Sequence, residues 1–230
     1  MGGVKTLLLW DIDGTLISAH GSGTAALCDS VRESFGIESD LSHIEIQGRT
    51  DRWIFQQILA TFIIPRTEEN MQLLERNYLA ALQPQIDRRG VTLLPGVRQI
   101  LDEAARFGDV EQGLLTGNLI AGAKLKLASH GLWDYFHFGA FADDAANRNE
   151  LGPLALTRAQ RYCGHDFAPE RVWVIGDTPH DITCGKVCGA RTLAVATGRN
   201  TLETLIEGKP CAAFRDLSDT NAFWRSVLAE

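Results

Sequence analysis

Hydrophobic residues gather in four short runs, and each run is followed by a polar loop and then by a segment with helical periodicity. The runs are Val4 to Trp10, Val110 to Leu115, Val172 to Ile175 and Thr192 to Ala196. Such short apolar runs are typical of parallel strands that are buried on both faces. The helical segments lie at 97–107, 121–130, 154–163, 182–188 and 202–207. This alternation predicts an α/β fold with a Rossmann-like, doubly wound parallel sheet.

The segment from 19 to 89 interrupts the alternation. It contains helical patterns but no convincing strand, and the patterns lie near 24–35, 51–62 and 68–82. Pro65 and Pro84 are expected to mark breaks, because proline lacks an amide hydrogen and clashes with the preceding helical turn. We therefore expect a core catalytic domain of residues 1–18 and 90–230, with an all-helical cap subdomain inserted at 19–89.

Reactive side chains follow three of the four predicted strands. The first strand ends in Asp11-Ile12-Asp13-Gly14-Thr15, the second in Thr116-Gly117-Asn118, and the third in Gly176-Asp177-Thr178-Pro179-His180-Asp181. In open parallel sheets, ligands bind outside the carboxyl ends of the strands. The sequence therefore predicts that several carboxylates and a hydroxyl group lie together at one edge of the sheet.

Carboxylates crowded in this way repel one another and raise each other's pKa unless a cation neutralises them. The available ligands are oxygens, with no accompanying set of histidines or cysteines, which favours Mg²⁺ over Zn²⁺. Mg²⁺ usually binds one or two carboxylates together with phosphate oxygens of a substrate. We therefore expect Mg²⁺ as the cofactor and a small phosphorylated metabolite as the substrate.

The three motifs, in this order and at strand ends, are similar to those of the haloacid dehalogenase superfamily of phosphotransferases. The resemblance covers nearly the whole chain and includes a helical cap after the first motif. The segment Arg49-Thr50-Asp51-Arg52 resembles the cap loop of phosphoglycolate phosphatase-like members. The resemblance implies a phosphatase that hydrolyses a small phosphomonoester, either phosphoglycolate-like or a sugar phosphate, through an aspartyl-phosphate intermediate.

The resemblance also implies a role for each motif. Asp11 would be the nucleophile, and Asp13 would be the general acid for the leaving alcohol and then the general base for water. Phosphoryl oxygens would be bound by Thr116, Gly117 and Asn118. The expected metal ligands are Asp11, the backbone carbonyl of Asp13, Asp177 and, in support, Asp181.

One part of the family pattern is absent in its usual form. The family usually supplies a lysine between the second and third motifs, whereas this chain has no lysine between Lys126 and Lys186. Arg148 stands in the corresponding place and is our candidate for the catalytic cation, because a guanidinium group can bind phosphate through two N–H groups. Lys124 and Lys126, on the helix after the Thr116 motif, are expected to be solvated.

The cap loop and the last motif each admit a second interpretation. Arg49 or Arg52, together with Thr50, is the expected substrate contact in the cap. The alternative is that Asp51 caps the following helix while the arginines lie on the surface. Asp177 and Asp181 could similarly cap the helix that follows them. The metal role is favoured for Asp177, because it lies at a strand end opposite the nucleophile.

Composition excludes several other classes of protein. A net charge of -7, without clustered Lys and Arg, argues against nucleic-acid binding. The five cysteines are odd in number and scattered, so no disulfide framework is expected. The first apolar run is too short for a signal sequence or a membrane span. We expect a cytoplasmic enzyme without a membrane or nucleic-acid partner, as a monomer or homodimer.

Alternatives within the family remain. Dehalogenases lack the second aspartate, so Asp13 favours phosphoryl chemistry. Phosphonatases need a cap lysine, and no lysine lies between Lys5 and Lys124. A phosphoglucomutase-type phosphotransferase stays open, because it differs only in the fate of the aspartyl-phosphate. A non-catalytic binding or regulatory member is a third alternative.

Overall fold

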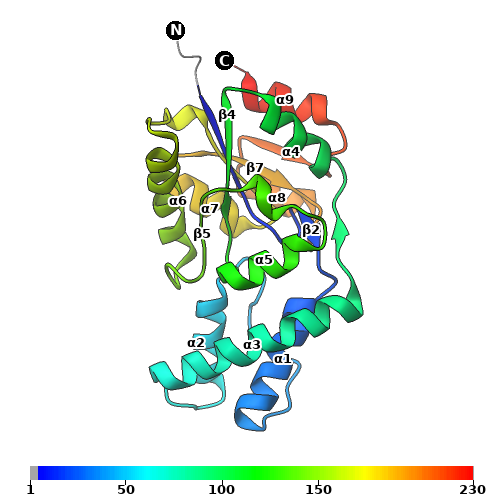
Figure 1. The fold of residues 1–230 in the computed structure, drawn as a ribbon, viewed down its shortest axis with the longest axis vertical. Helices are drawn as coiled ribbons and strands as arrows, with labels where there is room; N and C mark the ends of the chain where they lie inside the picture. Colours follow the sequence, from blue (N-terminus) through cyan, green and yellow to red (C-terminus); the bar gives the residue numbers. More distant parts are fainter. Residues whose placement is uncertain (1–4, 230) are drawn as a thin grey trace.

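Six parallel strands form the central sheet of the computed structural model, which describes residues 5–229. The strands are β1 (Thr6–Trp10), β4 (Val110–Leu115), β5 (Gly139–Ala140), β6 (Val172–Gly176), β7 (Arg191–Val195) and β8 (Ala212–Phe214). Their order across the sheet is β5-β4-β1-β6-β7-β8 (Figure 1). This arrangement confirms the predicted α/β fold.

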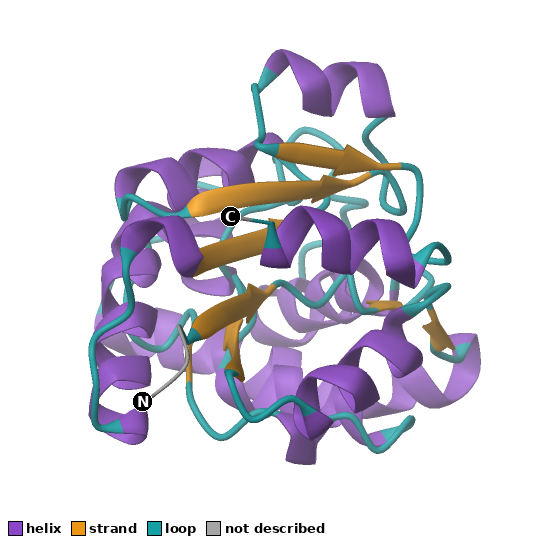
Figure 2. Cartoon of the chain, turned by 90° about the horizontal axis from the view of Figure 1, so that it is seen from above, coloured by secondary structure: helices purple, strands orange, loops and turns teal. Residues whose placement is uncertain are grey.

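Helices cover both faces of the sheet (Figure 2). One face packs against α4 (Val97–Arg106), α5 (Ile120–Ala128) and α9 (Thr220–Leu228). The other packs against α6 (Arg148–Cys163) and α7 (Pro179–Val187), while α8 (Leu202–Glu207) follows β7. In β1, Leu8 and Trp10 belong to the first core and Leu7 and Leu9 to the second. Burial on both faces explains why this strand is an unbroken apolar run.

Three helices lie between the short antiparallel strands β2 (Ile17–Ser18) and β3 (Thr92–Leu93). They are α1 (Ser22–Phe35), α2 (Asp51–Thr61) and α3 (Glu68–Arg89), and we call them the helical cap. The cap has a hydrophobic cluster of its own, in which the rings of Phe55 and Tyr78 meet edge to face. Figure 1 shows it beyond the carboxyl ends of the strands. The exact boundaries at 19 and 89 stay a prediction.

Several elements differ from the sequence-based expectation. Helix α3 continues through Pro84 to Arg89, because Leu82 and Ile86 on either side of the proline are buried. Helix α6 begins at Arg148 rather than at 154 and contains Pro153. The short strands β5 and β8 and the helix α9 were not expected at all. Packing therefore overrides local preference in these segments.

The structure also bears on the cysteines and on possible membrane-spanning helices. All five cysteines are free thiols. Between residues 5 and 229, the structure contains no helix with the length and apolar character needed to cross a bilayer.

Candidate active site

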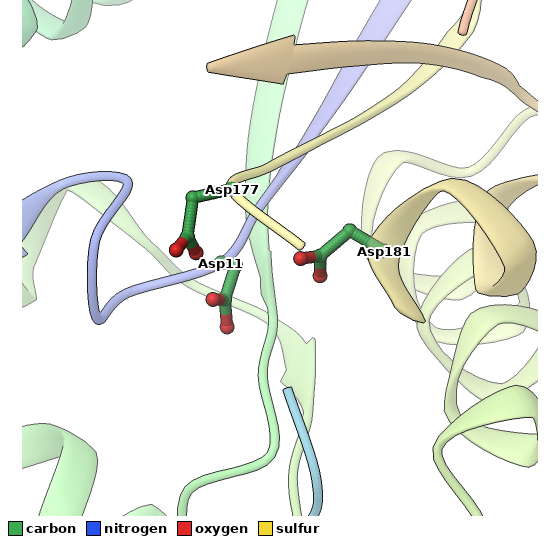
Figure 3. Close-up of side chains that lie close together, drawn as sticks. All are labelled: Asp11, Asp177 and Asp181. Atoms are coloured by element: carbon green, nitrogen blue, oxygen red, sulfur yellow. The ribbon is translucent and has the colours of Figure 1, made fainter. Parts of the chain in front are cut away.

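Three buried carboxylates meet at the carboxyl edge of the sheet (Figure 3). Asp11 directly follows β1, Asp177 directly follows β6, and Asp181 lies in the first turn of α7. Because β1 and β6 are paired neighbours in the sheet, their ends are adjacent. One oxygen from each carboxylate lies within 4.8 Å of the other two. This group of three oxygens has the size and chemistry to hold a divalent cation.

The carboxylates are in an environment that disfavours their negative charge. Burial raises the pKa of Asp11 to about 6, against the opposing effect of Arg148. Burial, followed by repulsion from Asp181 and Asp11, raises the pKa of Asp177 well above its ordinary value. The Oδ1 atom of Asp177 is buried and has no hydrogen-bond partner among residues 5–229. A bound Mg²⁺ would supply that partner and offset the repulsion, so the residues fit the predicted metal.

Two glycines bring the backbone against the carboxylate of Asp177. A Cβ atom at Gly198 would lie 1.7 Å from Oδ2 of Asp177, and one at Gly14 would lie 2.5 Å from the same atom. Gly14 also has a φ of +83°, which favours glycine. Neither position can carry a side chain unless the carboxylate moves.

Arg148, the first residue of α6, lies between two of the three carboxylates. Its Nη2 atom is 3.1 Å from Oδ1 of Asp11 and also donates a hydrogen bond to Oδ1 of Asp181. Its Nη1 atom donates to the carbonyl of Gly48 in the cap, at 3.3 Å. Attraction to both carboxylates outweighs the opposing effect of burial and raises the pKa of Arg148, so the guanidinium stays charged. The candidate cation therefore lies beside the predicted nucleophile.

The carboxylate of Asp181 is fully engaged within the protein. Its Oδ2 atom accepts hydrogen bonds from the backbone N–H of Thr178, at 3.0 Å, and from the Thr178 hydroxyl, at 2.6 Å. Thr178 is the N-cap of α7, and Asp181 completes the capping box three residues later. Asp181 therefore takes part in capping α7 through Oδ2, as the alternative interpretation expected. Its other oxygen, Oδ1, accepts the hydrogen bond from Arg148. Asp177 does not cap this helix.

Asp13 is more open than Asp11 and has a cation of its own. Its side chain is 41% exposed, and its Oδ2 atom accepts hydrogen bonds from Nδ2 of Asn118, at 2.9 Å, and from Nζ of Lys126, at 2.6 Å. Burial opposes the charge of Lys126, but Asp13 and Asp51 outweigh it, so the pKa of Lys126 is raised. The ammonium group therefore stays protonated.

The expectation that Lys126 is solvated is wrong, because its side chain is only 4% exposed. Lys124 is exposed, as expected. A signal in the sequence could have distinguished them. Lys126 is three residues after Ala123 and directly before Leu127, so it lies on the buried face of the helix with these two apolar residues.

The loop after β4 is held against the cap. Thr116 is fully buried, and its Oγ1 atom accepts hydrogen bonds from the backbone N–H and Nδ2 of Asn118, at 3.3 and 2.8 Å. The carbonyl of Gly117 accepts a hydrogen bond from the backbone N–H of Asp51, at 2.7 Å. A Cβ atom at Gly117 would lie 2.2 Å from the carbonyl oxygen of Arg49. Glycine therefore permits the close contact between this loop and the cap.

The two predicted substrate contacts in the cap loop, Arg49 and Thr50, lie in different surroundings. Arg49 lines the cavity, where its Nε donates to Glu45 at 3.0 Å and its guanidinium lies 4.4 Å from the centre of the Trp53 ring. Thr50 is buried and is the N-cap of α2. Its hydroxyl accepts from the N–H of Trp53 and donates to the carbonyl of Ala146. This geometry does not support a substrate contact by Thr50, because its hydroxyl is already used within the protein.

Asp51 connects the cap to the core and does not cap its own helix. Its carboxylate accepts a hydrogen bond from the backbone N–H of Leu119, at 2.8 Å, directly before α5. Burial raises the pKa of Asp51 to about 6, against the opposing effects of Lys126 and of this hydrogen bond. The charged form of Asp51 is therefore a source of instability near neutral pH.

Replacing Asp51 by Asn tests this assignment. The folded-state pKa of Asp51 lies above its unfolded value, so its charge costs stability once the pH rises through about 6. Between about pH 4 and about pH 7.5, the free energy of unfolding of Asp51→Asn relative to wild type should increase by up to about 3 kcal/mol. Urea unfolding at both pH values measures this shift. The exposed Asp87→Asn should show no such trend, and an equal trend in both variants would contradict the assignment.

The carboxylates open into a cavity of about 720 Å³ between the core and the cap. Asp11, Asp13 and Asp177 line it from the core, while the start of α1 and the cap loop from 40 to 49 line it from the other side. A cavity of this size accepts a small molecule but not a macromolecule.

Comparisons with known proteins identify the family of the chain. A sequence model of the family described as haloacid dehalogenase-like hydrolase matches residues 8–186. The chain belongs to this family. It is 29% identical over 212 residues to "Probable phosphatase IndB" of Dickeya dadantii (strain 3937), covering 90% of this chain and 88% of that protein. Family and relative together support the predicted enzyme class, a phosphatase-type hydrolase.

Solved structures share the fold at low sequence identity. A predicted phosphoglycolate phosphatase from Haemophilus somnus 129pt superposes with a TM-score of 0.71 at 17% identity, covering 95% of this chain and 97% of that one. A protein from Bacteroides vulgatus assigned as a β-phosphoglucomutase gives a TM-score of 0.73 at 19% identity, covering 98% and 90%. The helical cap and the parallel sheet therefore form one known architecture.

Proposed function

We propose that the protein is a Mg²⁺-dependent phosphatase that hydrolyses a small phosphomonoester through an aspartyl-phosphate on Asp11. The observation that carries the proposal is the pairing of two carboxylates with two separate cations at one cavity. Asp11 lies beside Arg148, and Asp13 lies beside Lys126. Two carboxylates in different surroundings are suited to two different roles in one reaction.

Each proposed role matches the surroundings of its residue. Asp11, the carbonyl of Asp13 and Asp177 would hold Mg²⁺, which when bound supplies charge neutralisation to the phosphoryl oxygens. A carboxylate oxygen of Asp11 attacks phosphorus, and Arg148 beside it stabilises the transferring group. The Thr116 hydroxyl and the backbone N–H of Gly117 would bind phosphoryl oxygens. The N–H of Asn118 donates to Oγ1 of Thr116 and holds that side chain in place before substrate arrives.

The proposed substrate is phosphoglycolate-like or a sugar phosphate. A cavity of about 720 Å³ is large enough for either. Arg49 at the cavity wall offers a positive charge to a carboxylate or a second phosphate, once its contact with Glu45 is given up. Mutase activity is the second candidate, favoured by the resemblance in fold to the Bacteroides vulgatus structure.

A panel of phosphomonoesters tests the proposal directly. The purified protein should release phosphate from at least one small phosphomonoester when Mg²⁺ is present, and EDTA should stop the release. A protein that releases no phosphate from any member is not the proposed phosphatase. Interconversion of sugar phosphates without phosphate release would establish the mutase instead.

Gly198→Ala tests the metal site independently of turnover. The new methyl group would force the Asp177 carboxylate away from its position, since a Cβ there lies 1.7 Å from Oδ2. Misplacing a group that orients a metal site typically weakens metal binding by about 10–100-fold. Calorimetric titration with Mg²⁺ measures the affinity. Gly108→Ala, which has no heavy atom within 4 Å of its Cβ position, is the matched control. Equal Mg²⁺ affinity in both variants would argue against Asp177 as a ligand.

A further inference from the structure

Each carboxylate of the Asp11-Ile12-Asp13 segment contacts its own cation, but the proposed reaction steps give a role to only one of the two cations. Arg148 lies 3.1 Å from Asp11 and is the proposed substitute for the family's usual lysine. Lys126 lies 2.6 Å from Asp13 and has no role in the steps described above. It comes from α5, a different element from the one that carries Arg148.

Lys126 lies where the core meets the cap. A Cβ atom at Gly23 in α1 would be 3.6 Å from Nζ of Lys126 and 3.8 Å from the hydroxyl of Tyr78 in α3. The ammonium group at the end of this core side chain therefore lies against the start of the cap helix α1. Burying a lysine in this way costs free energy unless its charge is paired. The groups that neutralise the charge of Lys126 therefore indicate its role.

The contacts of Asp13 are one-sided. Nζ of Lys126 and Nδ2 of Asn118 both donate to the same oxygen, Oδ2, at 2.6 and 2.9 Å. Nζ also donates to Oδ1 of Asn118, at 2.6 Å, so the three side chains form a closed triangle. Within residues 5–229, no hydrogen bond reaches the other oxygen of Asp13, Oδ1. Because the side chain is 41% exposed and lines the cavity, Oδ1 is the oxygen open to substrate.

We infer that Lys126 is a positioning residue of the active site, which with Asn118 holds Oδ2 of Asp13 so that Oδ1 exchanges the proton with substrate and water. The inference rests on the proposed phosphatase function. Its physical basis is that a carboxylate oxygen which accepts two N–H donors has no lone pair left to carry a proton. Oδ1, the oxygen without such donors, is therefore the one left to meet the substrate oxygen in the cavity.

The proton balances over the two steps. In the first, a carboxylate oxygen of Asp11 bonds to phosphorus, the bond from phosphorus to the alcohol oxygen breaks, and that oxygen takes the proton from Oδ1 of Asp13. In the second, water oxygen bonds to phosphorus and loses a proton to Oδ1 of Asp13. The bond between phosphorus and Asp11 breaks, which returns both aspartates to their starting states. Lys126 keeps its proton throughout.

The test compares two substrates that differ in their need for a proton. The first is an alkyl phosphate on which the wild type is active, and the second is p-nitrophenyl phosphate, whose nitrophenolate leaves without protonation. The measured quantity is kcat/KM, since it reports phosphoryl transfer to Asp11 when that step is the first irreversible one. Lys126→Met should lower it roughly 100-fold for the alkyl phosphate and less than about fivefold for p-nitrophenyl phosphate.

Two further variants separate positioning from a structural role. Lys126→Arg, which keeps a charged donor, should recover at least about tenfold of the alkyl phosphate rate. Lys124→Met, an exposed lysine two residues earlier in the same helix, should match the wild type on both substrates. If Lys126→Met does not fold, Lys126→Gln is measured in the same pair of assays, because its amide keeps a donor and removes the charge.

The outcomes distinguish this inference from the proposed function. Equal losses on both substrates, or no loss on the alkyl phosphate, would overturn the role of Lys126 and leave the phosphatase function intact. A wild-type protein with no Mg²⁺-dependent activity on either substrate would instead overturn the proposed function. A loss confined to the alkyl phosphate supports both.

Discussion

Replacing Asp11 by Asn is expected to lower kcat by about 10⁴-fold or more, which is a typical cost of removing a covalent nucleophile. An amide oxygen is a poor nucleophile, so no aspartyl-phosphate should form on this residue. The change is otherwise nearly isosteric, and the amide can still accept a hydrogen bond from Arg148. Single-turnover phosphate release with excess enzyme measures the loss, and mass spectrometry of acid-quenched protein should find the phosphoryl group on wild type only.

A stability measurement distinguishes loss of the nucleophile from loss of the folded structure in Asp11→Asn. Burial raises the pKa of Asp11 to about 6, above its unfolded value, so its charge costs stability above that pH. In EDTA near neutral pH, Asp11→Asn should therefore be at least as stable as the wild type. Asp109→Asn, an exposed aspartate just before β4, serves as the control with full activity. An Asp11→Asn protein that keeps activity within about tenfold of wild type would show that the nucleophile is another group.

The parts of the fold that were predictable are those in which local pattern and packing agree. The strand β4 was predicted with its observed ends, and β1 to within two residues. In β1, burial on both faces leaves an almost uninterrupted apolar run, whereas β4 is apolar at its two ends and carries Glu111 and Gln112 between them. β5 and β8, with two and three residues, are too short to leave such a run. They are specified by pairing with a neighbouring strand, which is not visible in a local window.

The predicted helix boundaries were wrong where proline was expected to end or exclude a helix. Pro84 lies inside α3 and Pro153 inside α6, although each removes a helical hydrogen bond. Around Pro84, the buried side chains of Leu82 and Ile86 hold both halves of α3 in place. The loss of one hydrogen bond is offset by the burial of the helix face, which depends on partners that are distant in the sequence.

The candidate site shows the same division. Asp11 and Asp177 were expected together because topology brings strand ends to one edge, and Arg148 was added because it stands where the family usually has a lysine. The structure brings the three residues together. Lys126 was missed because a lysine is normally solvated, and its partner Asp13 lies 113 positions away. The sequence also does not reveal that the hydroxyl of Thr50, an expected substrate contact, donates to the carbonyl of Ala146. Hydrogen bonds between residues that are distant in the sequence decide both cases.

Arg148→Ala is expected to damage catalysis and stability together. In the folded protein, Arg148 is the cation that contacts Asp11 and Asp181, both of which are buried. Removing one member of a buried charged group leaves the others uncompensated, at a cost of about 3–5 kcal/mol. The lost stabilisation of the transferring phosphoryl group should lower kcat/KM by about 10³-fold. Urea unfolding and steady-state kinetics measure the two effects.

Arg148→Lys distinguishes charge from geometry. Lysine, the residue the family usually supplies, keeps the charge but cannot reach Asp11, Asp181 and the Gly48 carbonyl with a planar set of donors. The expected loss in kcat/KM is about tenfold, with the stability largely recovered. A rate as low as that of Arg148→Ala would show that the planar guanidinium, and not its charge alone, supports phosphoryl transfer.

Arg158→Ala provides the matched control for the Arg148 variants. Arg158 lies on the same helix and pairs with Asp144, but its side chain is 43% exposed. Exposed ion pairs contribute about 0–1 kcal/mol to stability. Arg158→Ala should therefore lower the free energy of unfolding by at most about 1 kcal/mol and leave kcat/KM nearly unchanged. If Arg148→Ala behaved like Arg158→Ala, Arg148 could not be the cation that serves Asp11. Lys126, the other buried cation at this cavity, would then become the first candidate for that role, because the nucleophile still requires a positive charge nearby.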